Sequence, residues 1–251
     1  MPRDEQVRAR MFLGAVLPAL ETLSQHDSKA ASLAASWDGS IFFRVALAGP
    51  KTTLKFLRGH VEVFPSQMPG TDIRLFFPTH AMLSRLFTGK TTLPVLYRGV
   101  SRIKGLITFM RLAQYLEQVL DGQASDTITR STLMLGIMTR SLVILAEHET
   151  ASRELRKSLS GIAEFRITDT AAMQIDFSSE KPLAKTGGAH RPDFIIEFRS
   201  PELFLQVAQD KVDVMAQVCL ETILLKGDLH MGQAITVLLD KIGSYLHEEV
   251  R

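Results

Sequence analysis

Cysteine is almost absent from this chain: Cys219 is the only one in 251 residues. An intramolecular disulfide is therefore excluded, and such sparse cysteine is typical of a reducing compartment. Cys219 lies among apolar residues and has no base beside it in the sequence. We expect it to be buried and to pack as a small apolar side chain, not to act as a nucleophile.

Long apolar runs are also lacking. The longest one, residues 133–146, is interrupted by Arg140 and is shorter than the roughly 20 residues that span a bilayer. The first residues, Met1–Glu5, do not show the apolar stretch behind a basic start that a secretory signal has. We therefore expect a cytoplasmic protein without a membrane span.

Neither sign of charge dominates the chain. The net charge of +2 gives no support to nucleic-acid binding, which needs many phosphate contacts from Lys and Arg. The two halves differ, however: residues 1–125 hold 15 Lys and Arg against 9 Asp and Glu, and residues 126–251 hold 14 against 18. Neutral divergence would explain this difference. So would a basic half that faces an anionic surface, an anionic headgroup or the acidic half of a second copy.

Catalytic and metal-binding patterns are missing too. The seven histidines include no pair at the spacing of metal ligands. Glu147–Glu149 lies at the expected end of a helix and is interpreted as a solvated terminus. Thr88–Thr91 resembles the end of a phosphate-binding loop, but Ser84 stands where that motif needs glycine. We therefore predict no metal, no cofactor and no catalytic residue.

What the chain does have is an internal repeat, because its second half matches its first at an offset of 121 or 122 residues. The matched pairs are Gly14 with Gly136, Gly39 with Gly161, Arg44 with Arg166, Asp72–Phe77 with Asp193–Phe198, and Ile103–Gly105 with Leu225–Gly227. These matched residues, which we call anchors, occur in the same order in both halves, and their offset changes by only one residue. This pattern indicates duplication. We predict two units, residues 1–122 and 126–251, joined by a small polar linker. A binding pocket can be duplicated in this way, whereas a catalytic set need not be.

Periodicity predicts the same order of elements in each unit: helix, three strands, helix, strand, helix. In the first unit the expected helices are 7–23 (divided at Pro18), 28–37, one from Thr79, and 106–120; the strands are 40–47, 53–64 and 71–77, with strand-like sequence up to Lys104. In the second, the helices are 129–147, 150–159, one that Ser200-Pro201 begins, and 229–246; the strands are 161–168, 171–177, 193–198 and 221–226, with a polar loop at 179–192. Strands grouped between helices indicate an α+β fold.

Residues 193–246 resemble the C-terminal part of the sterol carrier protein 2 (SCP2) domain. In that family a strand leads to a helix that ends in a Gly-Lys or similar turn. A short strand follows, its end marked by lysine, glycine and then Asn or Asp, and an amphipathic helix closes the domain. Here Asp210-Lys211 stands at the turn and Ile223–Asp228 at the strand end, while Glu221 replaces a glycine that the family favours.

The first unit resembles the same pattern in part. Thr88–Lys90 fits the turn, Tyr97–Gly99 an aromatic-glycine segment and Val100–Gly105 the short strand, but Leu106 stands where the family favours Asn or Asp. The resemblance implies an α+β fold of two tandem SCP2-like units, each a mostly antiparallel five-stranded sheet covered by helices. It also implies a hydrophobic tunnel that takes sterols, fatty acyl chains or isoprenoids. Some bacterial relatives assist ubiquinone synthesis, which adds quinone precursors to these ligands.

Apolar side chains at helical spacing are the candidate lining of the tunnel. The methionines among them suit an adaptable wall. Ordinary core packing is the alternative for each of these residues, which are Met82, Leu86, Phe109, Leu112, Leu116, Val207, Met215, Met231, Ile235 and Leu238. Lys104 and Lys226 precede matched glycines and are candidates for contact with an acidic headgroup; the alternative is that they are exposed charges at strand ends.

Together these observations predict non-catalytic binding or transfer of an apolar ligand in a hydrophobic tunnel. The expected partner is a lipid or another hydrophobic small molecule, with transient contact to a membrane surface, homo-oligomers and no nucleic acid. Three alternatives stay open: a scaffold or interaction protein whose cavities have closed, an accessory subunit that presents a hydrophobic substrate to an enzyme, and an enzyme that holds such a substrate itself.

Overall fold

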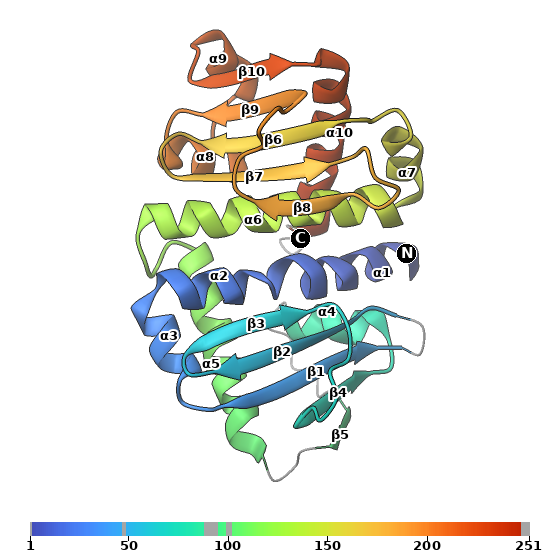
Figure 1. Ribbon diagram of the computed structural model, residues 1–251, viewed down its shortest axis with the longest axis vertical. Coiled ribbons are helices and arrows are strands. Elements are labelled where there is room, and N and C mark those ends of the chain that lie inside the picture. Colours follow the sequence, from blue (N-terminus) through green and yellow to red (C-terminus); the bar gives the residue numbers. More distant parts are fainter. Residues whose placement is uncertain (1, 47–48, 88–94, 99–101, 247–251) are drawn as a thin grey trace. The chain divides into compact units, whose positions relative to one another are not determined.

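The computed structural model describes residues 2–46, 49–87, 95–98 and 102–246. The chain divides after Ser125 into two compact units. Each unit contains one five-stranded sheet accompanied by helices (Figure 1). The predicted α+β class is therefore confirmed.

The first unit begins with helices and continues with a run of four strands. The helices are α1 (Pro2–Met11), the π-helical segment η1 (Phe12–Val16), α2 (Ala19–His26) and α3 (Ser28–Ala34). The strands are β1 (Gly39–Val45), β2 (Lys51–Leu57), β3 (His60–Phe64) and β4 (Ile73–Phe77), followed by α4 (His80–Phe87), β5 (Val95–Arg98) and α5 (Ile103–Leu120). Pro18 separates η1 from α2, as its missing N–H predicts.

The second unit follows the same plan. It contains α6 (Thr127–His148), α7 (Thr150–Arg156), β6 (Ile162–Ile167), β7 (Ala171–Asp176), β8 (Leu183–Thr186), β9 (Phe194–Phe198), α8 (Pro201–Ala208), α9 (Val214–Cys219), β10 (Ile223–Gly227) and α10 (Leu229–Leu246). Ser200 caps α8 by accepting the N–H of Leu203, and Pro201 occupies its first turn, as expected.

Both sheets have the same topology. The strand order is β3-β2-β1-β4-β5 in the first and, read from the corresponding edge, β8-β7-β6-β9-β10 in the second. The central pairs β1–β4 and β6–β9 are parallel, and the other pairs are antiparallel. The sheets are therefore mixed, and the antiparallel pairs outnumber the parallel one in each.

One hydrogen bond recurs at matched positions of the two sheets. The Asp72 carboxylate accepts the backbone N–H of Ser40 at 2.9 Å, and the Asp193 carboxylate accepts that of Ile162 at 2.7 Å. In both units the bond joins the start of the first strand to the residue before its parallel neighbour. The anchors at offsets of 121 and 122 residues therefore occupy equivalent places in the fold.

Alternate residues of the central strands form a buried inner face in each unit. In the first sheet these residues, at most 1% exposed, are Ile41, Phe43, Val45, Ile73, Leu75 and Phe77. In the second sheet they are at most 6% exposed and are Ala163, Phe165, Ile167, Phe194, Ile196 and Phe198. The alternation is incomplete, because Phe42 and Glu164 on the opposite faces are also buried, at 1% and 0% exposed.

Three sequence predictions of strands are wrong. Residues 53–64 are not one strand, because Arg58 and Gly59 have φ angles of 49° and 85° and turn the chain between β2 and β3. The expected polar loop at 179–192 contains β8, which pairs with β7 at the sheet edge. Ile103–Gly105, expected at the end of a strand, begins α5.

The last difference has a local cause. In the second unit, Gly227 adopts a φ of 102° and the Asp228 carboxylate accepts the N–H groups of His230 and Met231, so α10 is capped at its start. Leu106 stands at the position that matches Asp228 and has no side-chain oxygen to do this. The helix in the first unit begins earlier, at Ile103.

Helix α6 passes a length and composition test for a membrane span, alone among the helices of the described ranges. It extends beyond the apolar run of residues 133–146 at both ends. Within the second unit it contacts α7, α8, α10, β7 and β8, and 61% of its most apolar window is buried. These contacts are those of a core helix.

The tryptophan ring of the first unit lies against two glycines. A Cβ atom on Gly105 of α5 would come within 2.6 Å of the Trp37 ring, and one on Gly39 within 2.3 Å. The ring also packs against Phe56, with 5.5 Å between the ring centroids. The first turn of α5 can approach the Trp37 ring this closely only because Gly105 has no side chain.

Replacement of Gly105 by alanine should destabilise the first unit. Alanine is the better helix former by about 1 kcal/mol, but overpacking against a ring held on other sides costs typically 1–3 kcal/mol, so we expect a net loss. Urea unfolding followed by Trp37 fluorescence would measure it. Gly243→Ala on α10 is the matched control, because its Cβ would meet nothing within 4 Å and stability should stay equal or rise. A midpoint for Gly105→Ala at or above that of the native chain would contradict this account of the packing.

Candidate functional site

The inner face of the second sheet and the helices that cover it form the apolar core of that unit. Helix α6 contacts β7 and β8, while α8 and α10 contact β9. Figure 1 shows α8 and α10 on the far side of the sheet from the viewer. Phe198 of β9 meets Phe204 of α8 edge to face, with 5.1 Å between the ring centroids. A Cβ on Gly232 would lie 2.8 Å from the Phe194 ring, so this glycine lets α10 come close to β9.

The predicted lining residues of α10 belong to this region. Met231, Ile235 and Leu238 are 1%, 0% and 0% exposed and recur at helical spacing on one side of the helix. Val207 of α8 is half-buried, whereas Met215 of α9 is 68% exposed and stands outside the enclosed space. The structure therefore brings together three of the five predicted lining residues of this unit.

The corresponding residues of the first unit lie on α5 and α4. Phe109, Leu112 and Leu116 are at most 4% exposed, and the Phe109 ring contacts Phe43 of the inner face at 5.1 Å between centroids. Met82 of α4 is half-buried. The side chain of Leu86 lies outside the described part of the chain.

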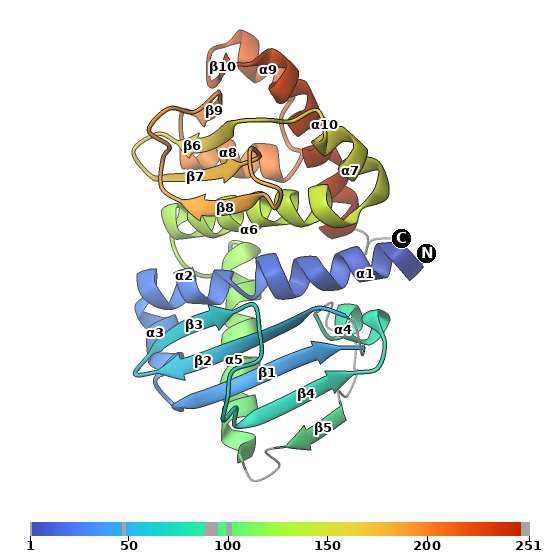
Figure 2. The same cartoon turned by 45° about the vertical axis from the view of Figure 1, so that its right-hand side comes forward.

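Helical cover is incomplete at the β10 edge of the second sheet. Leu225 pairs with Ile196 and shares its face, yet it is 42% exposed because β10 is the edge strand. Helix α9, beside β10 (Figure 2), buries none of its residues. We name the exposed apolar side chains of α9, β10 and their flanks the β10 apolar patch; they are Val214, Met215, Leu220, Leu225 and Leu229.

The turn between α9 and β10 differs from expectation at two residues. Cys219 was expected to be buried, and this is wrong: the free thiol is exposed, because α9 packs none of its side chains into the core. Glu221, which stands where the resemblance favours glycine, has a φ of 56°. A non-glycine residue in this left-handed region carries a conformational cost. The connection between α9 and β10 is therefore exposed to solvent at Cys219 and strained in its backbone at Glu221.

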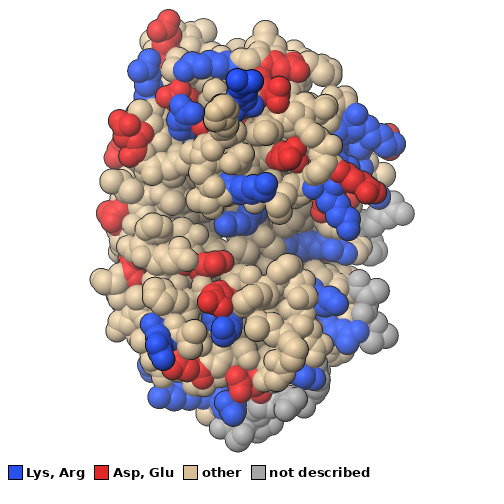
Figure 3. Space-filling model, in the orientation of Figure 1, with Lys and Arg blue, Asp and Glu red and all other residues tan. Residues whose placement is uncertain are grey.

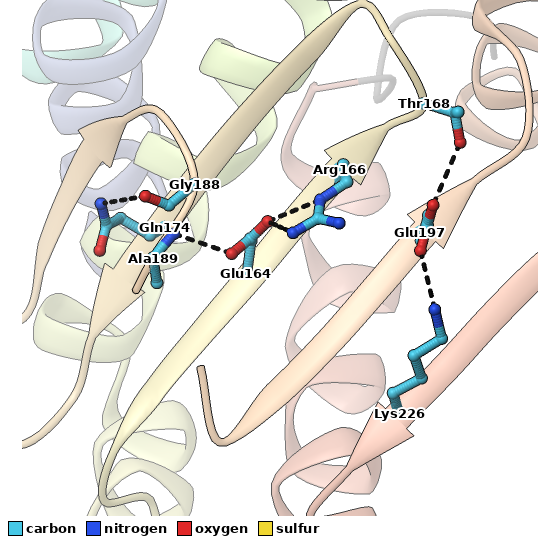
Figure 4. A network of polar contacts seen from close by, with 8 residues as sticks. All are labelled: Glu164, Arg166, Thr168, Gln174, Gly188, Ala189, Glu197 and Lys226. Carbon is cyan, nitrogen blue, oxygen red and sulfur yellow. Dashed lines mark hydrogen bonds and ion pairs between the residues drawn. The ribbon is translucent and has the colours of Figure 1, made fainter. Parts of the chain in front are cut away.

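The outer face of the second sheet is polar and internally paired (Figure 4). The Lys226 ammonium lies 3.1 Å from the Glu197 carboxylate, which also accepts a hydrogen bond from Thr168. The hydrogen bond from Lys226 lowers the pKa of Glu197 although partial burial opposes the shift. Lys226 thus points away from the apolar inner face. Lys104, its match, is an exposed residue in the first turn of α5.

A buried carboxylate holds a loop over this outer face. Glu164 is fully buried, and the guanidinium of Arg166 donates to it at 2.6 and 2.8 Å. The N–H of Ala189 also donates to it at 2.8 Å, which fixes the segment after β8 above the sheet. Figure 3 shows acidic and basic side chains interspersed over this face. Their mutual pairing favours a structural role.

A charged hollow of about 380 Å³ lies elsewhere in the unit, where α6 ends and α7 begins. The residues that line it all have ionisable side chains and are Glu147, His148, Arg153, Arg156, Lys157, Glu180 and Lys181. Arg156 donates to the carbonyls of Ser179 and Glu180 and so ties α7 to the loop after β7. In the described ranges no group of three or more His, Cys, Asp or Glu side chains could hold a metal ion.

Glu149 joins the junction of α6 and α7 to the closing helix α10. Its carboxylate caps α7 by accepting the N–H of Ser152 at 2.6 Å, and it pairs with Lys241 of α10 at 3.0 Å. Burial would raise the pKa of Glu149, but the hydrogen bonds from the Ser152 hydroxyl, Lys241 and two backbone N–H groups lower it to about 2. The solvated helix end expected at Glu147–Glu149 is thus a tie between helices.

Comparison with known proteins connects the second unit to one family. Residues 143–240 match the SCP-2 sterol transfer family, a span from the last turns of α6 to α10 that is less than half of the chain. The SCP2-like interpretation is thereby supported for the second unit. The interpretation of the first unit as a second SCP2 copy remains a prediction. No curated protein matches the chain.

Solved structures of SCP2 proteins are similar at low identity. Domain 2 of the sterol carrier protein of Helicoverpa armigera is 16% identical, covers 46% of this chain and 87% of its own, and gives a TM-score of 0.35. Sterol carrier protein 2 from Yarrowia lipolytica in its apo form is 15% identical over 43% and 90%, with a TM-score of 0.34. The ubiquinone synthesis protein UbiJ-SCP2 is 14% identical over 40% and 87%, with a TM-score of 0.33.

The Glu149–Lys241 tie makes the stability of the second unit depend on pH. Because folding lowers the pKa of Glu149 from 4.5 to about 2, its contribution is complete above pH 4.5 and is lost as the pH falls toward 2. Glu149→Gln should lower stability at neutral pH by about 1–3 kcal/mol and flatten the pH dependence in that window. Differential scanning calorimetry would show both effects. Glu154→Gln, on an exposed side chain of the same helix, should change neither. Equal pH profiles for native protein and Glu149→Gln would contradict the assignment.

Proposed function

We propose that the second unit binds an apolar ligand without covalent chemistry, between the inner face of its sheet and helices α6, α8 and α10. The family match spans these elements, and the family is described as one of sterol transfer. The single observation that carries the proposal is the incomplete cover at β10. Leu225 belongs to the inner face yet is 42% exposed, so the apolar interior reaches solvent there.

The structure describes this region in a closed form. Met231, Ile235 and Leu238 are buried, so a ligand must displace α9, α10 or both to reach the inner face. Movement of α9 costs little packing free energy, because α9 buries none of its own residues. The β10 apolar patch would then receive the first contact of an apolar chain, and α9 would act as the movable cover.

Burial of a lipid chain supplies enough free energy for this. At about 0.8 kcal/mol for each buried CH₂, a long acyl or isoprenoid chain contributes on the order of 10 kcal/mol before losses. Association entropy and the ordering of side chains remove a large part of that gain. We therefore expect a dissociation constant on the order of micromolar. Sterols are the first ligands to test, and fatty acyl chains and quinone precursors follow from the resemblance. We assign no chemical step to the protein.

A scaffold is the second candidate, and one observation favours it. The candidate lining residues of α10 and α5 are all at most 4% exposed, which describes filled cores, while the β10 apolar patch remains exposed. A protein with closed cavities would use such a patch to bind another protein. The two functions differ in whether purified protein contains or takes up a lipid.

Native mass spectrometry followed by organic extraction tests the proposal. Ile235→Trp should fill the inner space and abolish bound lipid, or weaken uptake of a fluorescent sterol and a fluorescent fatty acid at least ten-fold. Leu112→Trp on α5 is the matched control, because it introduces the same overpacking of typically 1–3 kcal/mol in the first unit. Binding by native protein and by Leu112→Trp, but not by Ile235→Trp, would place the ligand in the second unit. Native protein that contains no lipid and takes up neither probe would favour the scaffold.

A further inference from the structure

The outer side of α5 carries apolar residues that are exposed in the described part of the first unit. Ile103, Ile107 and Met110 are 64%, 44% and 59% exposed. Their spacing of four and then three residues places them on one side of the helix, opposite the side that buries Phe109 and Leu112. The N-terminal end of α5 lies at the end of the unit that carries β5 (Figures 1 and 2). We name these three residues and the two cations that flank them, Lys104 and Arg111, the α5 face.

The cations of this face are not used within the unit. Arg102, just before the helix, pairs with Asp72 at 2.7 Å. Lys104 and Arg111 are exposed and make no ion pair within the described ranges. Residues 102–116 contain no Asp or Glu, so no acidic side chain of this segment offsets their charge. The result is an apolar stripe with positive charge along one edge.

Neither feature stabilises the helix. Lys104 lies in the first turn, where the helix dipole disfavours a cation, and that turn has no acidic residue and no side-chain cap. The exposed side chains of Ile103 and Ile107 contribute no burial free energy, because they stay in contact with water. At the matched positions of the second unit, residues 225–228 form the end of β10 and the cap of α10 instead. The first unit therefore has a helical surface there that the second does not have.

The exposed apolar surfaces of the two units differ in the sign of their surroundings. In the segments that carry the β10 apolar patch, the exposed acidic residues Asp210, Asp213, Glu221 and Asp228 outnumber the exposed cations Lys211 and Lys226. An anionic lipid surface would repel that region and attract the α5 face. The basic character of the first half is thus found beside the α5 face, and the acidic character of the second half beside the β10 apolar patch.

We propose that the α5 face docks onto an anionic lipid bilayer. Ile103, Ile107 and Met110 enter the region between headgroups and acyl chains, and Lys104 and Arg111 contact the lipid phosphates. The helix lies along the surface in the manner of an amphipathic helix, with its buried side still packed on β1. Attachment is weak and reversible, because two cations and three partly inserted side chains contribute. It does not depend on the ligand proposed for the second unit.

Trp37 provides a native probe for this docking. Its ring lies within contact of the first turn of α5, and it is the only tryptophan of the chain. The native protein should co-float with vesicles of phosphatidylcholine mixed with phosphatidylglycerol and change its Trp37 emission as they are added. Vesicles of phosphatidylcholine alone should bind it much more weakly, and added salt should release it.

Two variants and one control test which residues are responsible. Lys104→Glu with Arg111→Glu should weaken vesicle binding at least about 25-fold, about five-fold for each cation removed. Ile103→Asn with Ile107→Asn should weaken it at least about ten-fold. Lys51→Glu with Arg58→Glu makes the same change in net charge at exposed positions on β2 and the turn after it, and should leave binding within about two-fold of native.

The proposal fails if native protein does not bind the anionic vesicles. That result would favour a protein partner for the α5 face. It also fails if the control pair weakens binding as much as Lys104→Glu with Arg111→Glu, because net charge would then explain the effect. Ile235→Trp, which tests the ligand site of the second unit, should bind the vesicles as native protein does. If Ile235→Trp still binds vesicles but takes up no ligand, membrane docking by the α5 face is independent of the ligand site.

Discussion

Each sheet depends on one charge-assisted hydrogen bond at the start of its central parallel pair. Asp72 and Asp193 accept the N–H of Ser40 and Ile162, so the first and fourth strands of each unit enter the sheet in a fixed register. Register matters here because a slip of one residue would turn the buried side chains of a strand toward solvent. The same aspartates also position the closing helices. Asp72 pairs with Arg102, and the carbonyl of Asp193 accepts the N–H of Asp228.

The separation into two faces follows from that register and determines which residues can serve a ligand. In the second sheet, Phe194, Ile196 and Phe198 face the helices, while Glu197 and Lys226 pair with each other on the other side. The apolar face that the proposed ligand would meet therefore lies under α6, α8 and α10. The buried Glu164 and its bonds to Arg166 and Ala189 close the polar face independently of it. The inner face packs against the helices, and the outer face carries the polar contacts within the sheet and to the loop after β8.

The sequence predicted most reliably what local chemistry decides. Pro18 divides the first helix, Ser200 and Pro201 begin α8, and the bounds of α10 agree with the apolar period of residues 229–246. Features that depend on neighbours in space were missed. Whether a strand is central or at an edge comes from topology, so the pairing of β8 and the exposure of Leu225 could not be read from residue types. Cys219 has apolar neighbours in sequence but belongs to a helix that touches little of the core.

The segment formed by α9 and the turn at Glu221 has a consequence for how the second unit opens. A helix of six residues with no buried side chain has little tertiary stabilisation, and a left-handed glutamate follows it. Local unfolding of this segment therefore needs only a small part of the free energy that unfolds the unit as a whole. Its backbone amides should exchange with solvent while those of α6 and β6 stay protected. The second unit thus combines a packed core with one weakly packed element beside β10.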